Sequence, residues 1–187
     1  MFKFLIFLAL LACSSFLITD AFSVEVELLK ESDRILDTMG WLELGNTAEA
    51  LAELDRIDPQ FQSQPVAQAT RLECFMAAKQ WDSAAELAEQ LCTQCPDEAG
   101  MWLHYAYSTR RCIDGSVKLA YEILAPMLAV FPDEWLIAYN LACYLCQMNR
   151  LDEAEEMLAK ATASGGEKVD QLATEDEDLA PLRERKI

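Results

Sequence analysis

An internal repeat limits what this chain can fold into more than any other feature of its sequence. Four segments align on one alanine, with spacings of 34, 36 and 34 residues between the aligned positions: Ala50, Ala84, Ala120 and Ala154. A second apolar residue follows each alanine by four positions, which places both on one face of a helix, one turn apart. A fixed period of this length predicts a stack of similar supersecondary units.

Each unit has the pattern of two helices joined by a short turn. In the fourth unit, apolar residues recur at helical spacing from Ile137 to Leu145, and residues 149–154 then make a turn and open a second helix. Pro96 and Pro132 each follow an aligned alanine by twelve residues and end the second helix of the middle units. No stretch alternates with period two for long enough to suggest a strand. The sequence therefore predicts an all-α fold.

These residues resemble the tetratricopeptide repeat (TPR), a helix–turn–helix family. The fourth unit matches best, through Leu141-Ala142 and Ala154, whereas the first is degenerate because Pro59 comes only nine residues after Ala50. The resemblance implies a right-handed superhelical solenoid of about four repeats, at about 26–60, 65–98, 99–134 and 135–166, in a domain spanning 26–163. Residues 167–187 would form a C-terminal cap or tail. Packing between repeats is expected from Ala50, Ala84, Ala120, Ala154, Trp102, Leu141 and Ala142.

Residues 1–21 have the pattern of a signal peptide or an N-terminal membrane anchor. Lys3 precedes an apolar run of 15 residues, from Phe4 to Ile18, which is short for a membrane span and typical of a signal-peptide core. A lipobox-like stretch ends at Cys13, which would then be the lipidated residue. We expect an exported or membrane-anchored protein that meets the membrane only through this segment. The alternative is a mis-assigned start codon and a cytoplasmic protein.

The charge balance and the missing motifs exclude several classes of function. The chain has 15 Lys+Arg against 32 Asp+Glu, a net charge of −17, which makes nucleic acid and acidic partners poor candidates. It has one histidine, His104, and it lacks a glycine-rich phosphate loop and a nucleophile elbow. We therefore expect a protein that is not an enzyme and holds no cofactor or metal.

Seven cysteines are the most tempting chemical feature, and two pairs have C-x-x-C spacing: Cys92 with Cys95, and Cys143 with Cys146. The pairs stand 47 residues apart, against about 15–20 in a zinc ribbon. Cysteine also serves as a small buried hydrophobe between packed helices, which is the interpretation we favour. A thiol-redox or metal-binding protein that uses the two pairs stays as the alternative function.

The resemblance to TPR proteins implies a concave groove lined by the first helix of each repeat. The implied groove residues come from three repeats: Met76, His104, Tyr107, Arg110, Arg111, Tyr139, Asn140 and Gln147. Arg110 and Arg111 would form a local positive, aromatic patch, and Tyr and Arg often dominate interface energies. Alternatively, the two arginines only neutralise neighbouring acids.

We therefore predict a protein-interaction scaffold or adaptor that binds a protein or peptide partner, of unknown identity, in this groove. Self-association through the degenerate first repeat is a further possibility, because Trp41 and Leu42 would be poorly covered there.

Overall fold

The computed structural model describes residues 18–185, with side chains from Lys30 onward, and this part of the chain contains helices and no strand. The elements follow one another as α1 (Ile18–Glu43), α2 (Thr47–Asp55), α3 (Pro59–Gln62), α4 (Pro65–Ala77), α5 (Trp81–Gln94), α6 (Ala99–Thr109), α7 (Val117–Leu124), α8 (Met127–Val130), α9 (Trp135–Gln147), α10 (Leu151–Gly165), α11 (Glu167–Glu175), the 3-10 turn η1 (Glu177–Leu179) and α12 (Ala180–Arg185). The predicted all-α helical repeat solenoid is confirmed.

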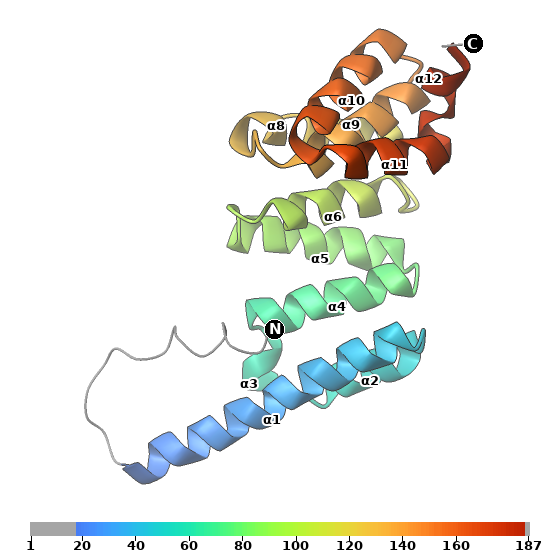
Figure 1. The fold of residues 1–187 in the computed structure, drawn as a ribbon. Helices are drawn as coiled ribbons and strands as arrows, with labels where there is room; N and C mark the ends of the chain where they lie inside the picture. Colours follow the sequence, from blue (N-terminus) through green and yellow to red (C-terminus); the bar gives the residue numbers. More distant parts are fainter. Residues whose placement is uncertain (1–17, 186–187) are drawn as a thin grey trace.

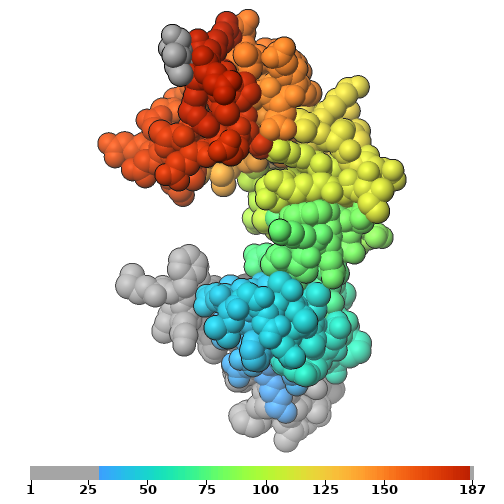
Figure 2. Space-filling view, turned by 90° about the vertical axis from the view of Figure 1, so that its right-hand side faces the viewer, coloured from blue at the N-terminus to red at the C-terminus, as the bar shows by residue number. Residues whose placement is uncertain are grey.

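The helices form consecutive pairs that stack along one direction (Figure 1). The pairs are α1 with α2, α4 with α5, α6 with α7, and α9 with α10, and each pair packs mainly on its neighbours in sequence. The stack is curved, so that its two ends flank a hollow on one side (Figure 2). After the last pair, α11 and α12 pack on α10, and η1 packs on α9.

The aligned alanines lie where the two helices of a pair approach each other. Ala50, Ala84, Ala120 and Ala154 are all completely buried. A methyl side chain lets two helix backbones come close, and a larger residue would force them apart. Among the other expected packing residues, Ala142 is completely buried, Leu141 is buried, and Trp102 is half-buried against the same core.

The turns between the two helices of three pairs share one backbone conformation, a residue with positive φ. Gly45, Lys79 and Asn149 each precede the aligned alanine by five residues, and each has a positive φ, of 74°, 57° and 58°. The amide of the next residue then bonds back to the carbonyl five positions earlier, as in Gln80 to Phe75 at 2.8 Å. This is a Schellman-type C-cap, which satisfies carbonyls at the helix end and reverses the chain.

The third pair departs from this pattern because its turn is longer. Two extra residues in the third repeat move the turn to 110–116, and the Ser116 side chain accepts a bond from the amide of Leu119 to start α7. Gly115 is required there, because a Cβ at this position would lie 1.7 Å from the carbonyl oxygen of Thr109.

The predicted leader at the N-terminus and the location inferred from it are not supported by the structure. Cys13 and all but the last residue of the predicted apolar leader lie outside the described residues. Within residues 18–185 we find no helix with both the length and the apolar character needed to cross a membrane. The sequence of α1 carries too many charges, with Lys30, Glu31 and Asp33 near its middle. The predicted location, exported or anchored through the N-terminal segment, is therefore contradicted.

The first repeat also covers its aromatic residue better than expected. Trp41 and Leu42 pack against a cluster that contains Ala50 and Leu54, so they are partly buried. From Lys30 onward, α1 exposes the large apolar side chains of Leu36 and Met39, and Leu44 directly after the helix is exposed as well.

Candidate binding groove

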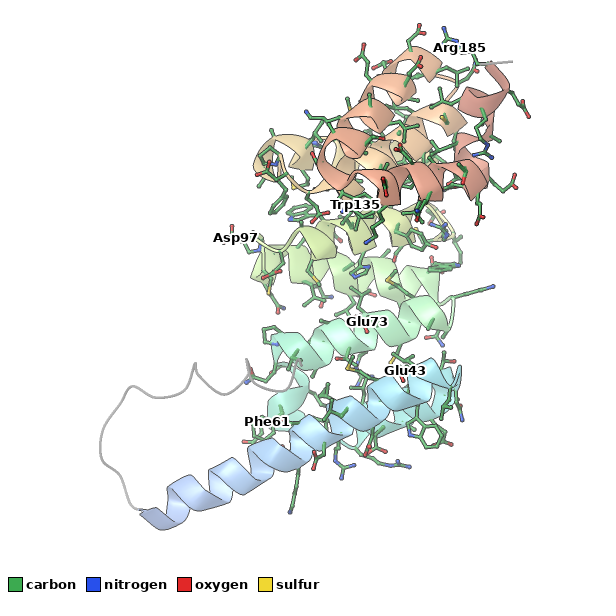
Figure 3. All side chains as sticks on the ribbon, viewed as in Figure 1. Glu43, Phe61, Glu73, Asp97, Trp135 and Arg185 are labelled. Carbon is green, nitrogen blue, oxygen red and sulfur yellow. The ribbon has the colours of Figure 1, made fainter. Side chains whose placement is uncertain are left out.

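The predicted groove residues lie on the first helices of three successive pairs. Met76 is on α4, His104 and Tyr107 are on α6, Arg110 and Arg111 follow at the C-terminal end of α6, and α9 carries Tyr139, Asn140 and Gln147. Figure 3 shows the side chains of these helices, with Glu73 marking α4 and Trp135 marking α9. The eight residues divide into three groups, which have different surroundings.

The first group holds two carboxylates of the chain's own C-terminal segment. Arg110 forms a two-pronged ion pair with Asp178: Nη2 donates to Oδ1 at 2.8 Å, and Nη1 donates to Oδ2. Gln147 Nε2 also donates to Oδ1 of Asp178, at 2.6 Å. The phenol of Tyr139 donates to Oδ2 of Asp176 at 2.8 Å. These three side chains thus form a carboxylate clamp, a name we keep for Arg110, Tyr139 and Gln147.

Burial makes the clamp stronger than an ordinary surface contact. The side chains of Arg110 and Asp178 are 16% and 24% exposed, and Tyr139 is buried. The hydrogen bond that Arg110 donates to Asp178 raises the pKa of Arg110, so the guanidinium stays charged. Burial and then the bond to Asp176 raise the pKa of Tyr139, so its hydroxyl keeps the proton that it donates. Bidentate Arg–carboxylate pairs are the strong, directional kind of hydrogen bond.

The second group is an open aromatic stack formed by Trp81, Tyr107 and Arg111. The Arg111 guanidinium lies 3.5 Å from the centroid of the Tyr107 ring and 5.5 Å from that of Trp81. The two rings meet edge to face, with centroids 5.9 Å apart. Arg111 also donates to the Tyr107 carbonyl at 2.9 Å, which fixes the guanidinium over the ring. Within residues 30–185 no carboxylate forms an ion pair with Arg111, whereas Arg110 beside it has Asp178.

The third group consists of Met76, His104 and Asn140, whose side chains are less accessible to a ligand. Met76 packs against the cluster around Leu72, and Asn140 donates to the carbonyl of Leu136 at 2.8 Å. His104 is half-buried, and burial lowers its pKa, so it is neutral at pH 7. The structure therefore brings Arg110, Tyr139 and Gln147 together and places Tyr107 and Arg111 in a separate stack.

Comparison with known proteins identifies the fold. Residues 65–108, which span α4, α5 and most of α6, match the family model described as tetratricopeptide repeat. The solved structure of MamA MSR-1 C2 is similar to this chain with a TM-score of 0.56 and 16% identity, over 85% of this chain and 99% of that one. Residues 65–108 therefore carry a tetratricopeptide repeat, and the described chain has an all-α repeat fold similar to that solved structure. No curated protein sequence matches this chain significantly.

Four of the six cysteines in the described residues are buried between packed helices. Cys74, Cys92, Cys143 and Cys146 are buried, and all six cysteines in the described part of the chain are free thiols. Burial raises the pKa of Cys74 to about 11 and that of Cys92 to about 12, and it raises the pKa of Cys143 as well. Thiols with raised pKa values are poor nucleophiles and poor metal ligands, because both roles need the thiolate.

Within the described residues, one set of potential metal-ligating atoms comes together. The sulfur of Cys143 and carboxylate oxygens of Asp176 and Asp178 lie within 4.8 Å of one another. Those carboxylates already accept bonds from Arg110, Gln147 and Tyr139, and the Arg110 charge opposes a cation there. The redox or metal-binding alternative is therefore not favoured.

Sequence reasoning missed the acidic half of the clamp. Asp176 and Asp178 belong to an acidic run, 175–178, that reads as a solvated surface, yet both are only half-exposed. Arg110 and Asp178 are 68 residues apart, so no local spacing signals their contact. Trp81 is the first residue of α5, and its place in the stack depends on how α5 and α6 pack.

Proposed function

We propose that this chain is a non-enzymatic scaffold that binds a segment of a partner protein in the groove lined by α4, α6 and α9. TPR folds serve in general as protein-interaction scaffolds, because stacked helix pairs create an extended curved surface. The hollow between the two ends of the stack supports this proposal (Figure 2).

The observation that carries the proposal is the stack of Trp81, Tyr107 and Arg111. Trp, Tyr and Arg are the residue types most enriched among side chains that dominate interface energies. Tyr107 is 36% exposed, and the ring contacts hold Arg111 in place before any partner arrives. A pre-ordered side chain loses little conformational entropy on binding, so more of its interaction energy appears as affinity.

The charge of the surroundings suggests how the stack selects a partner. The chain has a net charge of −17, and most arginines within residues 30–185 form an ion pair with a carboxylate, whereas Arg111 does not. It would attract a carboxylate or a backbone carbonyl of the bound segment. Ile113 lies two residues beyond Arg111 and is 86% exposed, so an apolar side chain of the same segment has a contact nearby.

The proposal is tested by capture of partners with the wild-type chain and with a Tyr107→Ala/Arg111→Gln variant. The variant removes the ring and the charge of the stack, and we expect at least tenfold less of each specifically captured protein. Lys118→Gln is the matched control, because Lys118 is an exposed cation on α7 that pairs with Glu122 at 3.6 Å. Equal capture by all three chains would refute the groove assignment.

A further inference from the structure

An open groove runs along the C-terminal helix α11, next to α9, and has a volume of about 950 Å³. Apolar atoms make up most of its surface, and Leu172, which lines it, is 44% exposed. Lys168, Leu172 and Glu175 all line the groove and share one face of α11, because they are spaced by four and three residues. In Figure 2 this part of the chain borders the hollow at its C-terminal end. We call this surface the α11 groove.

Three carboxylates border the α11 groove: Asp170, Glu175 and Asp176. Within residues 30–185 no lysine or arginine forms an ion pair with any of them. Glu175 is exposed, whereas Asp170 and Asp176 accept hydrogen bonds from the hydroxyls of Thr162 and Tyr139. A hydroxyl donor is neutral and leaves the negative charge of the carboxylate in place. The groove therefore has a negative rim.

Two cations lie close to this rim, and both make other contacts. Lys168 lines the groove, but its ammonium lies over the Trp135 ring, 5.1 Å from the ring centroid. Arg183 lies outside the groove and donates to two backbone carbonyls of the same segment, at 2.8 and 2.7 Å. Residues 167–178 as a whole contain six acidic residues and one lysine. The apolar surface of the groove is thus surrounded by an excess of negative charge.

We propose that the α11 groove binds a basic amphipathic segment of a partner protein, in which Lys or Arg side chains stand next to apolar ones. The apolar side chains of the segment pack against Leu172, and its cations pair with Asp170 and Glu175. Charge complementarity selects this occupant, because a chain with a net charge of −17 attracts a basic segment and repels an acidic one. The groove is separate from the aromatic stack on α5 and α6, so the inference goes beyond the proposed function and does not depend on it.

Lysine and arginine suit this groove for a further reason. Their alkyl stems pack on apolar surface while their charged heads reach the polar rim. One exposed ion pair contributes little to affinity, so recognition depends on several charges together with the apolar contact. The two contributions can be removed separately, and each then has its own matched control.

The test of charge measures the anisotropy of a fluorescein-labelled basic peptide, GKLARLKG, with the full-length chain. The acidic peptide GELAELEG has the same apolar residues, and we expect it to bind at least tenfold more weakly. Asp170→Asn/Glu175→Gln should weaken binding of the basic peptide at least fivefold. Glu86→Gln/Glu156→Gln is the control, because it removes the same charge from exposed side chains on α5 and α10, and it should change the affinity no more than about twofold.

Two further pairs of variants test the apolar surface and the sign of the charge effect. Leu172→Ser should weaken binding at least threefold, whereas Leu119→Ser, at a side chain that is 42% exposed on α7, should leave it unchanged. Lys168→Gln should strengthen binding at least twofold more than Lys160→Gln does, because Lys160 is an exposed cation on α10, away from the groove.

Three results would overturn the inference. The first is no binding of the basic peptide at concentrations up to about 1 mM. The second is equal affinity for the basic and acidic peptides. The third is an equal change in affinity within any of the matched pairs of variants, since general attraction to an acidic chain does not depend on position. Circular dichroism melting establishes that each variant is folded.

Discussion

The ion pair between Arg110 and Asp178 gives the sharpest energetic prediction, because it joins the third repeat to the C-terminal turn. Charges about 4 Å apart attract by about 4 kcal/mol at an effective dielectric constant of 20. Exposed pairs contribute about 0.2–1 kcal/mol, whereas removing one partner of a buried pair costs about 3–5 kcal/mol. With side chains 16% and 24% exposed, this pair lies between the two cases. We therefore expect a coupling energy of about 1–2 kcal/mol.

The assay is a double-mutant cycle in urea unfolding, with Arg110→Gln, Asp178→Asn and the double variant. Each single change should lower the free energy of unfolding by about 2 kcal/mol, which corresponds to about 4–8 °C in Tm for a domain of this size. The double variant should lose about 1–2 kcal/mol less than the two single losses added together. The exposed pair of Lys118 and Glu122 serves as the control cycle, with an expected coupling below about 0.5 kcal/mol. Equal coupling in both cycles would refute the claim that the clamp is a specific contact.

Three further predictions follow from packing and backbone geometry. Ala154→Leu should lower the free energy of unfolding in urea by about 1–3 kcal/mol, because Ala154 is completely buried. Ala159→Leu, on the exposed face of α10, is the control and should change it by no more than about 0.5 kcal/mol. Similar losses in the two variants would contradict the close packing of the helices at Ala154. Lys79→Gly should raise stability by about 0.5–1 kcal/mol, since φ is 57° there, and a lower Tm would count against this reasoning. Among the six cysteines in the described residues, Cys95 and Cys112 should react first with a thiol reagent, and the other four should react only after denaturation. Fast reaction of all six thiols in the native protein would disprove the burial of those four.

The repeat made the fold predictable, because its signal is both local and recurrent. Four alanines at a near-constant spacing fixed which face of each second helix meets its partner, and all four side chains are completely buried. The turns were less predictable, since Lys79 and Asn149 adopt the left-handed conformation that Gly45 adopts without strain. Only the common spacing from the aligned alanine reveals that these three turns are equivalent.

The candidate site was predictable only in part, because its partners are distant in sequence. Position within a repeat placed Tyr107 and Arg111 on the first helix of the third repeat, and they do lie together in one stack. The same reasoning grouped Arg110 with Arg111, although their surroundings differ completely: one binds Asp178 and the other stacks on aromatic rings. The expectation that both arginines neutralise nearby acids describes Arg110 alone. Charge counting along the sequence cannot distinguish two adjacent arginines whose side chains point to different neighbours.

The C-x-x-C motif of Cys143 and Cys146 has two interpretations, a redox site or helix packing, and the burial of both thiols favours packing. The C-x-x-C spacing of Cys143 and Cys146 is compatible with redox chemistry, but both side chains are buried on α9. Helix packing places them where burial raises the pKa of each thiol. The spacing arises from two apolar positions one helical turn apart.

The central claim is that a partner segment binds in the groove, at the stack of Trp81, Tyr107 and Arg111. Site-specific photo-crosslinking tests it most directly, with a photoreactive phenylalanine at position 107 in one chain and at position 119 in another. Tyr107 and Leu119 are similarly exposed, at 36% and 42%, but Leu119 lies on α7, the second helix of its pair. The account predicts crosslinks to a partner from position 107 and few or none from position 119. Equal crosslinking from both positions, or crosslinking from position 119 alone, would contradict it.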